Sequence, residues 1–175
     1  MTENNKILVI IDMQNDFCTG SLKNDAAVKI IPAIAKRLYF YRKNNYQIIY
    51  TMDTHFDNYL DTPEGKQIPI KHCIKNTWGW NIVDELKPLS NDEIIEKNEF
   101  KWNGNWSTII NTTNINNIEI VGTCTDICVI SNAESIAKLS NVTVNIIANE
   151  CAGLTPEKHQ NALNEMEKFA NIVYN

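Results

Sequence analysis

The sequence predicts a three-layer α/β/α fold, with a mostly parallel sheet of six strands between helices on both faces. Short β-branched apolar runs alternate along the chain with longer segments of helical periodicity, which is the pattern of repeated strand–helix units. One run, residues 6–11, is almost continuously apolar, as expected of a strand buried on both faces. The chain has 175 residues, of which 43% are hydrophobic and 21% charged, so we expect a single domain that spans residues 1–175.

Six segments carry the strand pattern. The first run ends at Asp12, and residues 46–52 form the second. The other strands are expected at residues 93–96, 117–122 and 142–148, with a short edge strand at residues 171–174.

Three segments carry the helical pattern. Apolar side chains recur at helical spacing in residues 28–44, and residues 127–139 form a second expected helix. The last helix opens at Thr155-Pro156-Glu157, because threonine is a good cap and proline fits the first helical turn.

Parallel sheets of this kind bind ligands at the carboxyl ends of their strands. Polar residues directly after strands are therefore the candidates for function, and long irregular segments add to them. The longest irregular stretch, residues 53–76, starts where the second strand ends.

The charge balance excludes several classes of partner. Sixteen Lys and Arg residues against twenty-one Asp and Glu residues give a net charge of −5, whereas general binding to nucleic acid or anionic membranes needs clustered positive charge. No apolar run approaches the roughly 18 residues of a membrane span, and residues 1–5 lack the basic and apolar regions of a signal peptide. We therefore expect a cytoplasmic protein whose five cysteines are thiols rather than disulfides.

Three side chains at separate strand ends combine the groups needed for nucleophilic catalysis. Asp12 follows the first strand, Lys97 follows the third, and Cys128 lies where the fourth turns into a helix. A partly buried carboxylate suits proton transfer, a lysine stabilises an anion, and a helix N-terminus favours thiolate. Taken singly, each also has an ordinary interpretation, as a turn aspartate, a surface lysine or a small buried thiol. Their convergence predicts Cys128 as a nucleophile with Asp12 as its base.

A second group lies in the long irregular stretch. Asp53 and His55 are two residues apart in extended backbone and so face one side, and Glu64 and His72 can complete a site. Carboxylate and imidazole ligands without thiolates suit zinc, manganese or ferrous iron. The alternative is that both histidines are ordinary polar residues, but two of only three histidines fall in this stretch. His159, on the last helix, is expected to be exposed and uninvolved.

Together these motifs resemble those of the isochorismatase-like cysteine hydrolases, and most closely the metal-containing nicotinamidase branch. The matching elements are Asp12-Met13-Gln14-Asn15-Asp16-Phe17, Asp53-Thr54-His55, Pro69-Ile70-Lys71-His72-Cys73, Lys97 and Gly122-Thr123-Cys124-Thr125-Asp126-Ile127-Cys128-Val129. They occur in the family's order over most of the chain. The resemblance implies a Rossmann-like fold with a six-stranded sheet and an assembly of identical chains.

The resemblance also implies a reaction, the hydrolysis of nicotinamide to nicotinate and ammonia through a thioester. Cys128 would attack the amide carbonyl, Asp12 would handle the proton, and Lys97 would support the charged centre. The backbone N–H groups of Cys124 and Cys128 would form the oxyanion hole, with a cis peptide bond before Cys124.

One divalent metal ion belongs to the same resemblance, with zinc favoured over manganese or iron. Its implied ligands are Asp53, His55 and His72, and it would bind the pyridine nitrogen. Glu64 is our choice for a fourth ligand over Asp57 or Asp61.

Aromatic residues are the expected substrate contacts. Phe17 matches the position of an aromatic that packs on the substrate ring. Trp102 is our second choice of contact, with Trp106, or a role in a dimer interface, as alternatives. No role is assigned to Cys18, Cys73 and Cys151.

Two other functions are consistent with the same residues. One is a sister cysteine amidohydrolase that acts on another small amide or N-carbamoyl compound, with the metal lost or structural. The other is a redox-responsive or scaffolding protein that uses Cys124 and Cys128, since residues four apart are neighbours on a helix. That last hypothesis leaves Asp12 and Lys97 without a purpose.

Overall fold

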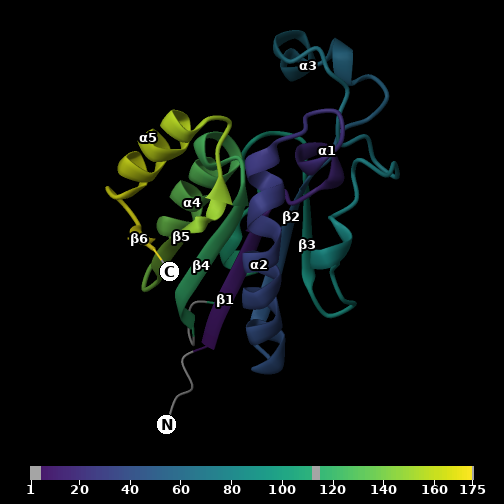
Figure 1. Ribbon diagram of the computed structural model, residues 1–175. Coiled ribbons are helices and arrows are strands. Elements are labelled where there is room, and N and C mark those ends of the chain that lie inside the picture. The colour runs from purple at the N-terminus through teal and green to yellow at the C-terminus, as the bar shows by residue number, and fades with distance from the viewer. Residues whose placement is uncertain (1–4, 112–114, 175) are drawn as a thin grey trace.

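Six parallel strands form the centre of the fold (Figure 1). The computed structural model describes residues 5–111 and 115–174, so the prediction that no signal peptide is present falls mostly on residues outside these ranges. The strands are β1 (Asn5–Ile11), β2 (Gln47–Asp53), β3 (Glu93–Lys97), β4 (Ile115–Thr123), β5 (Thr143–Ala152) and β6 (Asn171–Val173). Their order is β3-β2-β1-β4-β5-β6, and each neighbouring pair is parallel. The predicted α/β fold is confirmed, with a sheet that is entirely parallel.

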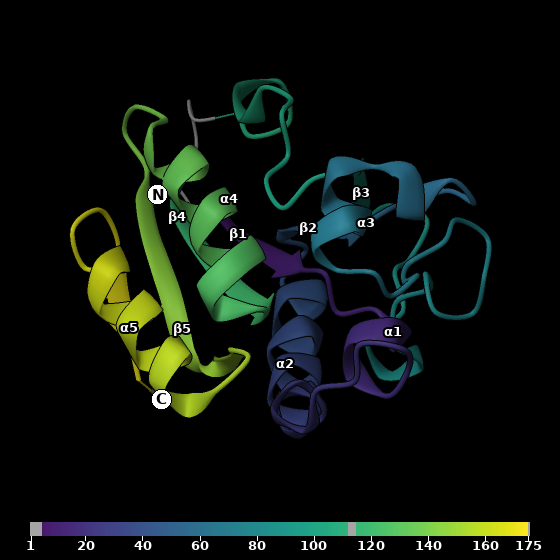
Figure 2. The same ribbon diagram turned by 90° about the horizontal axis from the view of Figure 1, so that it is seen from above.

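Helices cover the sheet and fill the connections between strands. They are α1 (Asn15–Cys18), α2 (Asp25–Lys43), α3 (Pro63–Gln67), α4 (Ile130–Ala137) and α5 (Pro156–Met166), with short turns η1 (Tyr59–Asp61), η2 (Asp84–Leu86), η3 (Trp106–Thr108) and η4 (Thr125–Val129). Figure 1 shows α3 beyond the carboxyl ends of the strands, and Figure 2 shows α1 and α3 on the opposite side of the molecule from α5. In the described part of the chain, none of these helices is long and apolar enough to cross a membrane.

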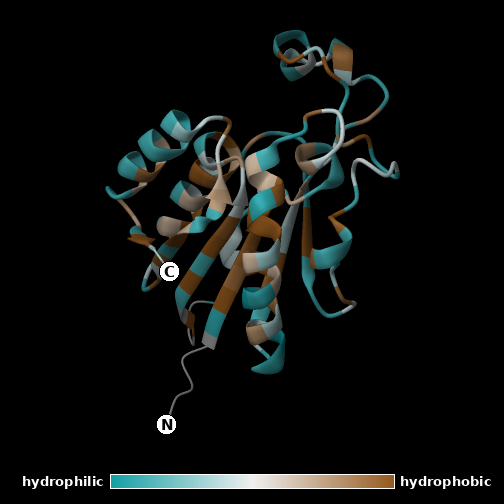
Figure 3. Cartoon of the chain, in the orientation of Figure 1, coloured by the Kyte–Doolittle hydropathy of each residue, from teal (hydrophilic) through white to brown (hydrophobic). Residues whose placement is uncertain are grey.

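Side chains of β1 alternate between two hydrophobic cores. Leu8 and Ile10 pack with α2, whereas Ile7 and Val9 pack on the other face with residues of α4 and α5. All four are fully buried, and Figure 3 shows the apolar central strands between helices with polar outer surfaces. A strand covered on both faces needs apolar residues at every position, which explains the continuous run in the sequence.

The strand register brings the candidate site residues to one edge. Asp53 pairs with Lys97 across β2 and β3, and Ile11 pairs with Thr51 on one side and Gly122 on the other. The sheet order changes direction between β1 and β4, which is where open α/β sheets bind ligands. Residues that follow β1, β2, β3 and β4 therefore lie together.

Caps account for the helix boundaries. α2 begins at Asp25, before the predicted start at residue 28, because the Asn24 Oδ1 accepts a hydrogen bond from the Ala26 N–H at 2.9 Å. α5 begins as predicted, with Thr155 Oγ1 accepting the Lys158 N–H at 3.1 Å.

Two segments differ from the expected pattern. The helix expected at residues 127–139 consists of one π-helical turn, η4, followed by α4. The stretch from residue 53 to residue 76 is not wholly irregular, since it contains η1 and α3. Both differences occur where the chain builds the candidate site.

Candidate active site and metal centre

Asp12, Lys97 and Cys128 meet at the carboxyl end of the sheet. Lys97 Nζ lies 2.7 Å from Asp12 Oδ2 and 3.8 Å from Cys128 Sγ. The three residues are buried, with Lys97 only 4% exposed. Lys97 ends β3, Asp12 follows β1 and Cys128 lies in η4, so three distant parts of the sequence supply one group.

Burial governs the ionisation of this group. It raises the pKa of Asp12, and the Lys97 ammonium opposes the rise. Burial also raises the pKa of the Cys128 thiol well above its usual range, again against the effect of Lys97. On Lys97 burial acts in the opposite sense, but the Asp12, Cys128 and Asp53 groups raise its pKa above the ordinary value. The lysine therefore stays protonated at neutral pH, while the thiol keeps its proton until a base removes it.

Thr51 orients the Asp12 carboxylate. Its Oγ1 donates a hydrogen bond to Asp12 Oδ1 at 2.6 Å, while the Asp12 N–H donates to the Thr51 carbonyl at 3.2 Å. Asp12 has a φ of 48°, in the left-handed region that aspartate tolerates better than most residues. These contacts direct the other oxygen, Oδ2, to Lys97. Thr51 could not be singled out from the sequence, because a threonine inside a strand is ordinary.

The backbone between Gly122 and Cys128 shapes the turn that carries the proposed nucleophile. Gly122 has a φ of +125°, and a Cβ there would lie 2.1 Å from a β1 carbonyl oxygen, so this position requires glycine. The peptide bond between Thr123 and Cys124 is cis, as the resemblance implied. The Cys124 carbonyl accepts hydrogen bonds from two amides of η4, both at 3.1 Å. These contacts start η4 directly at the end of β4.

His159 differs from its prediction. It is half-buried rather than exposed, and its Nδ1 lies 2.8 Å from Thr125 Oγ1. Burial lowers the pKa of His159. It therefore packs against the start of η4, although it lies on α5 far along the chain.

Asp53, His55, Glu64 and His72 form a second cluster. One ligand atom from each lies within 4.8 Å of the others. Asp53 Oδ2 is 3.0 Å from His55 Nε2 and 3.3 Å from His72 Nε2. Glu64 Oε1 is 3.5 Å and 3.7 Å from the same two nitrogens. The structure thus brings together the four residues expected to bind a metal.

Local structure aims the ligands from the long segment. Thr62 caps α3 by accepting a hydrogen bond at 3.0 Å from a backbone N–H of its first turn, which is where Glu64 lies. The Ile70 carbonyl lies 2.8 Å from His72 Nδ1, so this nitrogen is the donor and Nε2 is left for the cluster.

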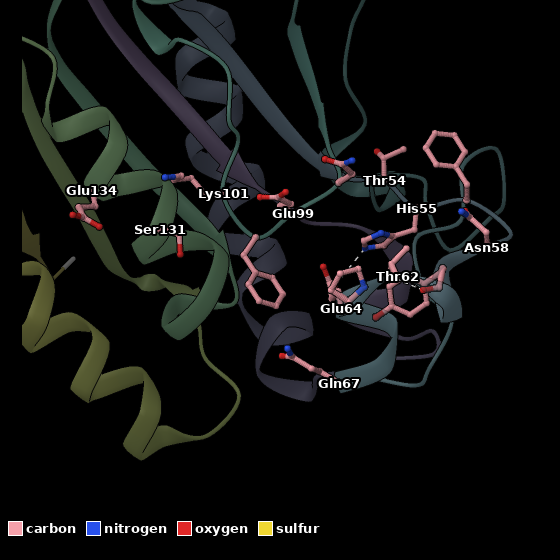
Figure 4. Close-up of a pocket in the computed structure, with 15 residues that line it drawn as sticks. Thr54, His55, Asn58, Thr62, Glu64, Gln67, Glu99, Lys101, Ser131 and Glu134 are labelled. Atoms are coloured by element: carbon pink, nitrogen blue, oxygen red, sulfur yellow. Dashed lines mark hydrogen bonds and ion pairs between the residues drawn. The ribbon is translucent and has the colours of Figure 1, made fainter.

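The cluster has the donor set of a divalent cation site. Glu64 Oε1 is buried and, among the described residues, has no hydrogen-bond partner. Figure 4 shows the His55 and Glu64 side chains pointing toward each other. Lys97 Nζ lies 3.5 Å from Asp53 Oδ1. Burial opposes ionisation of Asp53, but Lys97 and both histidines lower its pKa below the ordinary value. Two carboxylates and two imidazoles around one point suit zinc, manganese or iron.

A pocket of about 440 Å³ opens over both clusters, within the size range of small-molecule sites. Asp53, Glu64 and His72 line it, and so do Cys124 and Cys128. Its apolar lining residues are Phe17, Leu22, Ile68, Phe100, Ile127 and Leu154.

Of the two aromatic residues predicted to contact substrate, only Phe17 lines this pocket. Its ring centroid lies 5.6 Å from that of His72. The described lining residues do not include Trp102, which packs edge-on against Trp106 at 5.0 Å. Phe100 lines the pocket instead. The sequence offered several aromatic residues in this segment and no signal to choose between them.

Gln14, within the motif that starts at Asp12, also supports the site. It is fully buried. Its Oε1 accepts the Asp53 N–H, and its Nε2 donates to the Asp53 and Trp80 carbonyls, all at 2.8 Å. The side chain thereby fixes the backbone of a proposed metal ligand.

Three cysteines belong to neither of the two clusters. Cys18, Cys73 and Cys151 are buried free thiols. Burial raises the pKa of Cys18 and of Cys151 to about 12. The Cys73 N–H donates to Asp16 Oδ2 at 2.7 Å, next to His72.

Several known proteins are similar to this chain in sequence and fold. The family model described as "Isochorismatase domain" matches residues 6–174. The nicotinamidase/pyrazinamidase of Mycobacterium tuberculosis is 24% identical over 92% of this chain and 94% of its own. A ureidoacrylate amidohydrolase of Agrobacterium fabrum is 28% identical over 70% of this chain and 65% of its own. The structure of a pyrazinamidase of Pyrococcus horikoshii in complex with zinc superimposes with a TM-score of 0.86 at 26% identity, covering 98% of this chain and 99% of the other.

Proposed function

The chain belongs to the isochorismatase family, and on that premise we propose that it is a cysteine-dependent amidohydrolase of the nicotinamidase type. Its proposed reaction is the hydrolysis of nicotinamide to nicotinate and ammonia. One observation carries the proposal: the buried Lys97 ammonium contacts Asp12, Cys128 and Asp53, which are the proposed base, nucleophile and metal ligand. The proposed catalytic group and the proposed metal-binding group therefore both contact the same ammonium, next to one pocket.

The first half-reaction forms a thioester. The Cys128 thiol gives its proton to the Asp12 carboxylate, and its sulfur bonds to the amide carbonyl carbon. The negative charge that develops on the carbonyl oxygen accepts hydrogen bonds from the backbone N–H groups of Cys124 and Cys128. Asp12 then gives the proton to the leaving nitrogen, the C–N bond breaks and ammonia departs.

The second half-reaction returns the free thiol. Asp12 takes a proton from water, whose oxygen attacks the thioester carbon. The C–S bond breaks, and the Cys128 sulfur leaves with the proton held by Asp12. Lys97 remains protonated throughout, so that its ammonium stabilises both the Asp12 carboxylate and the developing thiolate.

Asp53, His55, Glu64 and His72 would hold one divalent ion, with zinc favoured. When bound, the ion supplies a Lewis-acid position for the ring nitrogen of a pyridine amide. Phe17 lines the same pocket, where its ring would pack against the ring of such a substrate.

Hydrolysis of another small amide or N-carbamoyl compound is the second candidate function. The 28% identity to a ureidoacrylate amidohydrolase favours it, because this value is as high as the identity to the pyrazinamidase structure. The chemistry of Cys128, Asp12 and Lys97 is the same for both candidates.

Ammonia release from nicotinamide, pyrazinamide and a set of N-carbamoyl compounds, with added zinc and with a chelator, separates the two. We expect zinc-dependent turnover of the two ring amides. Chelator-insensitive turnover of a non-pyridine compound alone would favour the second candidate, and no ammonia from any of them would refute both.

A further inference from the structure

A second pocket of about 740 Å³, drawn in Figure 4, shares lining residues with the 440 Å³ pocket described above. Figure 4 shows it between α3, which carries Gln67, and α4, which carries Glu134. Two residues, Glu64 and Phe100, line both pockets. Glu64 belongs to the metal cluster, and Phe100 is the other residue that lines both spaces.

Phe100 lies in an irregular segment after β3 and is itself 39% exposed. Its position therefore depends on how the backbone around it is held. Lys97 Nζ donates to the Glu99 carbonyl at 3.2 Å. On α4, the Asn132 side chain supplies further hydrogen bonds to this segment.

Both polar groups of the Asn132 side-chain amide form hydrogen bonds, which link this segment to η4, the turn that carries Cys128. Its Nδ2 donates to the Phe100 carbonyl at 3.0 Å and to the Cys128 carbonyl at 2.8 Å. Its Oδ1 accepts the Trp102 N–H at 2.9 Å. Asn132 is fully buried, and asparagine is a weak helix former. A buried amide is tolerated when its hydrogen bonds are made, so these three bonds account for its presence in the core.

We propose that Asn132 is a positioning residue that holds Phe100 as the wall between the two pockets and thereby limits the size of the amide that reaches Cys128. The part of this proposal that concerns substrates rests on the proposed function. Without the Asn132 side chain, the Phe100 carbonyl loses its hydrogen-bond donor, and we expect Phe100 to move toward the second pocket. The kcat/KM for larger amides then rises relative to that for nicotinamide.

Asn132→Thr is the test variant. A threonine hydroxyl on a helix can still donate to the carbonyl four residues earlier, here that of Cys128, but it cannot reach both groups of the loop. Ser135→Ala is the matched control, because the Ser135 Oγ donates to the Ser131 carbonyl on the same helix at 3.1 Å. It removes a local hydrogen bond without touching the Phe100 segment.

The readout is the ratio of kcat/KM for quinoline-3-carboxamide to that for nicotinamide. The fraction of correctly folded protein cancels in this ratio, so a merely structural effect does not change it. We expect the ratio to rise at least about fivefold in Asn132→Thr, in the range by which pocket walls discriminate between substrates. It should stay constant in Ser135→Ala. Phe100→Ala should raise the ratio similarly, and the double variant should add little, because both changes act on one wall.

Hydrogen exchange of the Trp102 amide gives a readout that does not need turnover. Its N–H donates to Asn132, so exchange should be at least about tenfold faster in Asn132→Thr and unchanged in Ser135→Ala. Unchanged exchange, an unchanged ratio, or multiplicative effects in the double variant would each overturn the proposal. If the unmodified protein releases no ammonia from either amide, the proposed function fails, and the exchange rate alone decides whether Asn132 holds the wall.

Discussion

Replacing Lys97 by methionine is expected to destabilise the protein strongly. The Lys97 side chain is almost fully buried, and its Nζ lies 2.7 Å from Asp12 Oδ2 and 3.5 Å from Asp53 Oδ1. Removing one partner of a buried ion pair costs about 3–5 kcal/mol, because the other charge is left without compensation. For a chain of this size, that corresponds to a fall in Tm of roughly 6–20 °C.

The loss should depend on pH. Burial raises the pKa of Asp12 and Lys97 opposes that rise, so the pKa rises further without the lysine. A group whose pKa is higher in the folded than in the unfolded state stabilises the fold below its unfolded pKa and loses that contribution as the pH rises through the folded value. The loss of unfolding free energy in Lys97→Met is therefore smallest near pH 4, close to the ordinary pKa of an aspartate. It is largest near pH 8, where we expect about 3–5 kcal/mol.

Guanidinium unfolding curves at both pH values measure this directly. The matched control is Lys168→Met, which removes an exposed ion pair with Glu165 on α5, where the side chains are 67% and 56% exposed. We expect that control to cost less than about 1 kcal/mol at either pH. A loss for Lys97→Met that is no larger than the control, or that is equal at the two pH values, would refute the buried ion pair as the source of stability.

Three further predictions concern the ligands and the base. The Thr51 hydroxyl donates to Asp12 and thereby lowers the pKa of Asp12. In Thr51→Val, kcat should fall about tenfold or more, and the acidic limb of its pH profile should move to higher pH. Thr51→Ser should restore both, and an acidic limb that does not move would count against this role. Glu64→Gln should lower the zinc content of purified protein by about tenfold, whereas Asp61→Asn should not; the opposite result would make Asp61 the ligand. Removing zinc with a chelator should lower the free energy of unfolding by about 2.7 kcal/mol relative to protein in zinc at a hundredfold excess over Kd, and an unchanged calorimetric Tm would argue against a bound ion.

Much of the fold could be predicted from local pattern. The continuous apolar run in β1 reflects burial on both faces, and the Thr155 cap starts α5 as expected. The split of the helix after β4 into η4 and α4 could not be predicted. It depends on the Cys124 carbonyl accepting two amides of η4, and apolar periodicity does not report such a contact.

The candidate site was predictable where chemistry coincides with a strand end. Asp12, Lys97 and Cys128 could be singled out because each stands at such a position, and the structure brings the three together. Thr51 and Asn132 were missed, because their importance comes from partners far along the chain: Asp12 for the first, the Phe100 segment for the second. A buried polar residue in a strand or helix looks the same in sequence whether its bonds are local or distant.

Trp102 shows a further limit. The sequence places it in the segment that follows Lys97, together with Phe100. Side-chain direction in an irregular segment is set by its contacts rather than by a repeat. Here the Trp102 N–H binds Asn132 and its ring packs on Trp106, and Phe100 is left to line the pocket.

Ammonia release by zinc-loaded Cys128→Ala, compared with the unmodified protein, tests the central claim most directly. Cys151→Ala is the control, since it removes another buried free thiol, one that the proposed mechanism does not use. We expect Cys128→Ala to lose about ten thousandfold or more of kcat, as when a nucleophile is removed, and Cys151→Ala to stay within about threefold because it removes only a small buried group. Turnover that survives in Cys128→Ala would contradict the account.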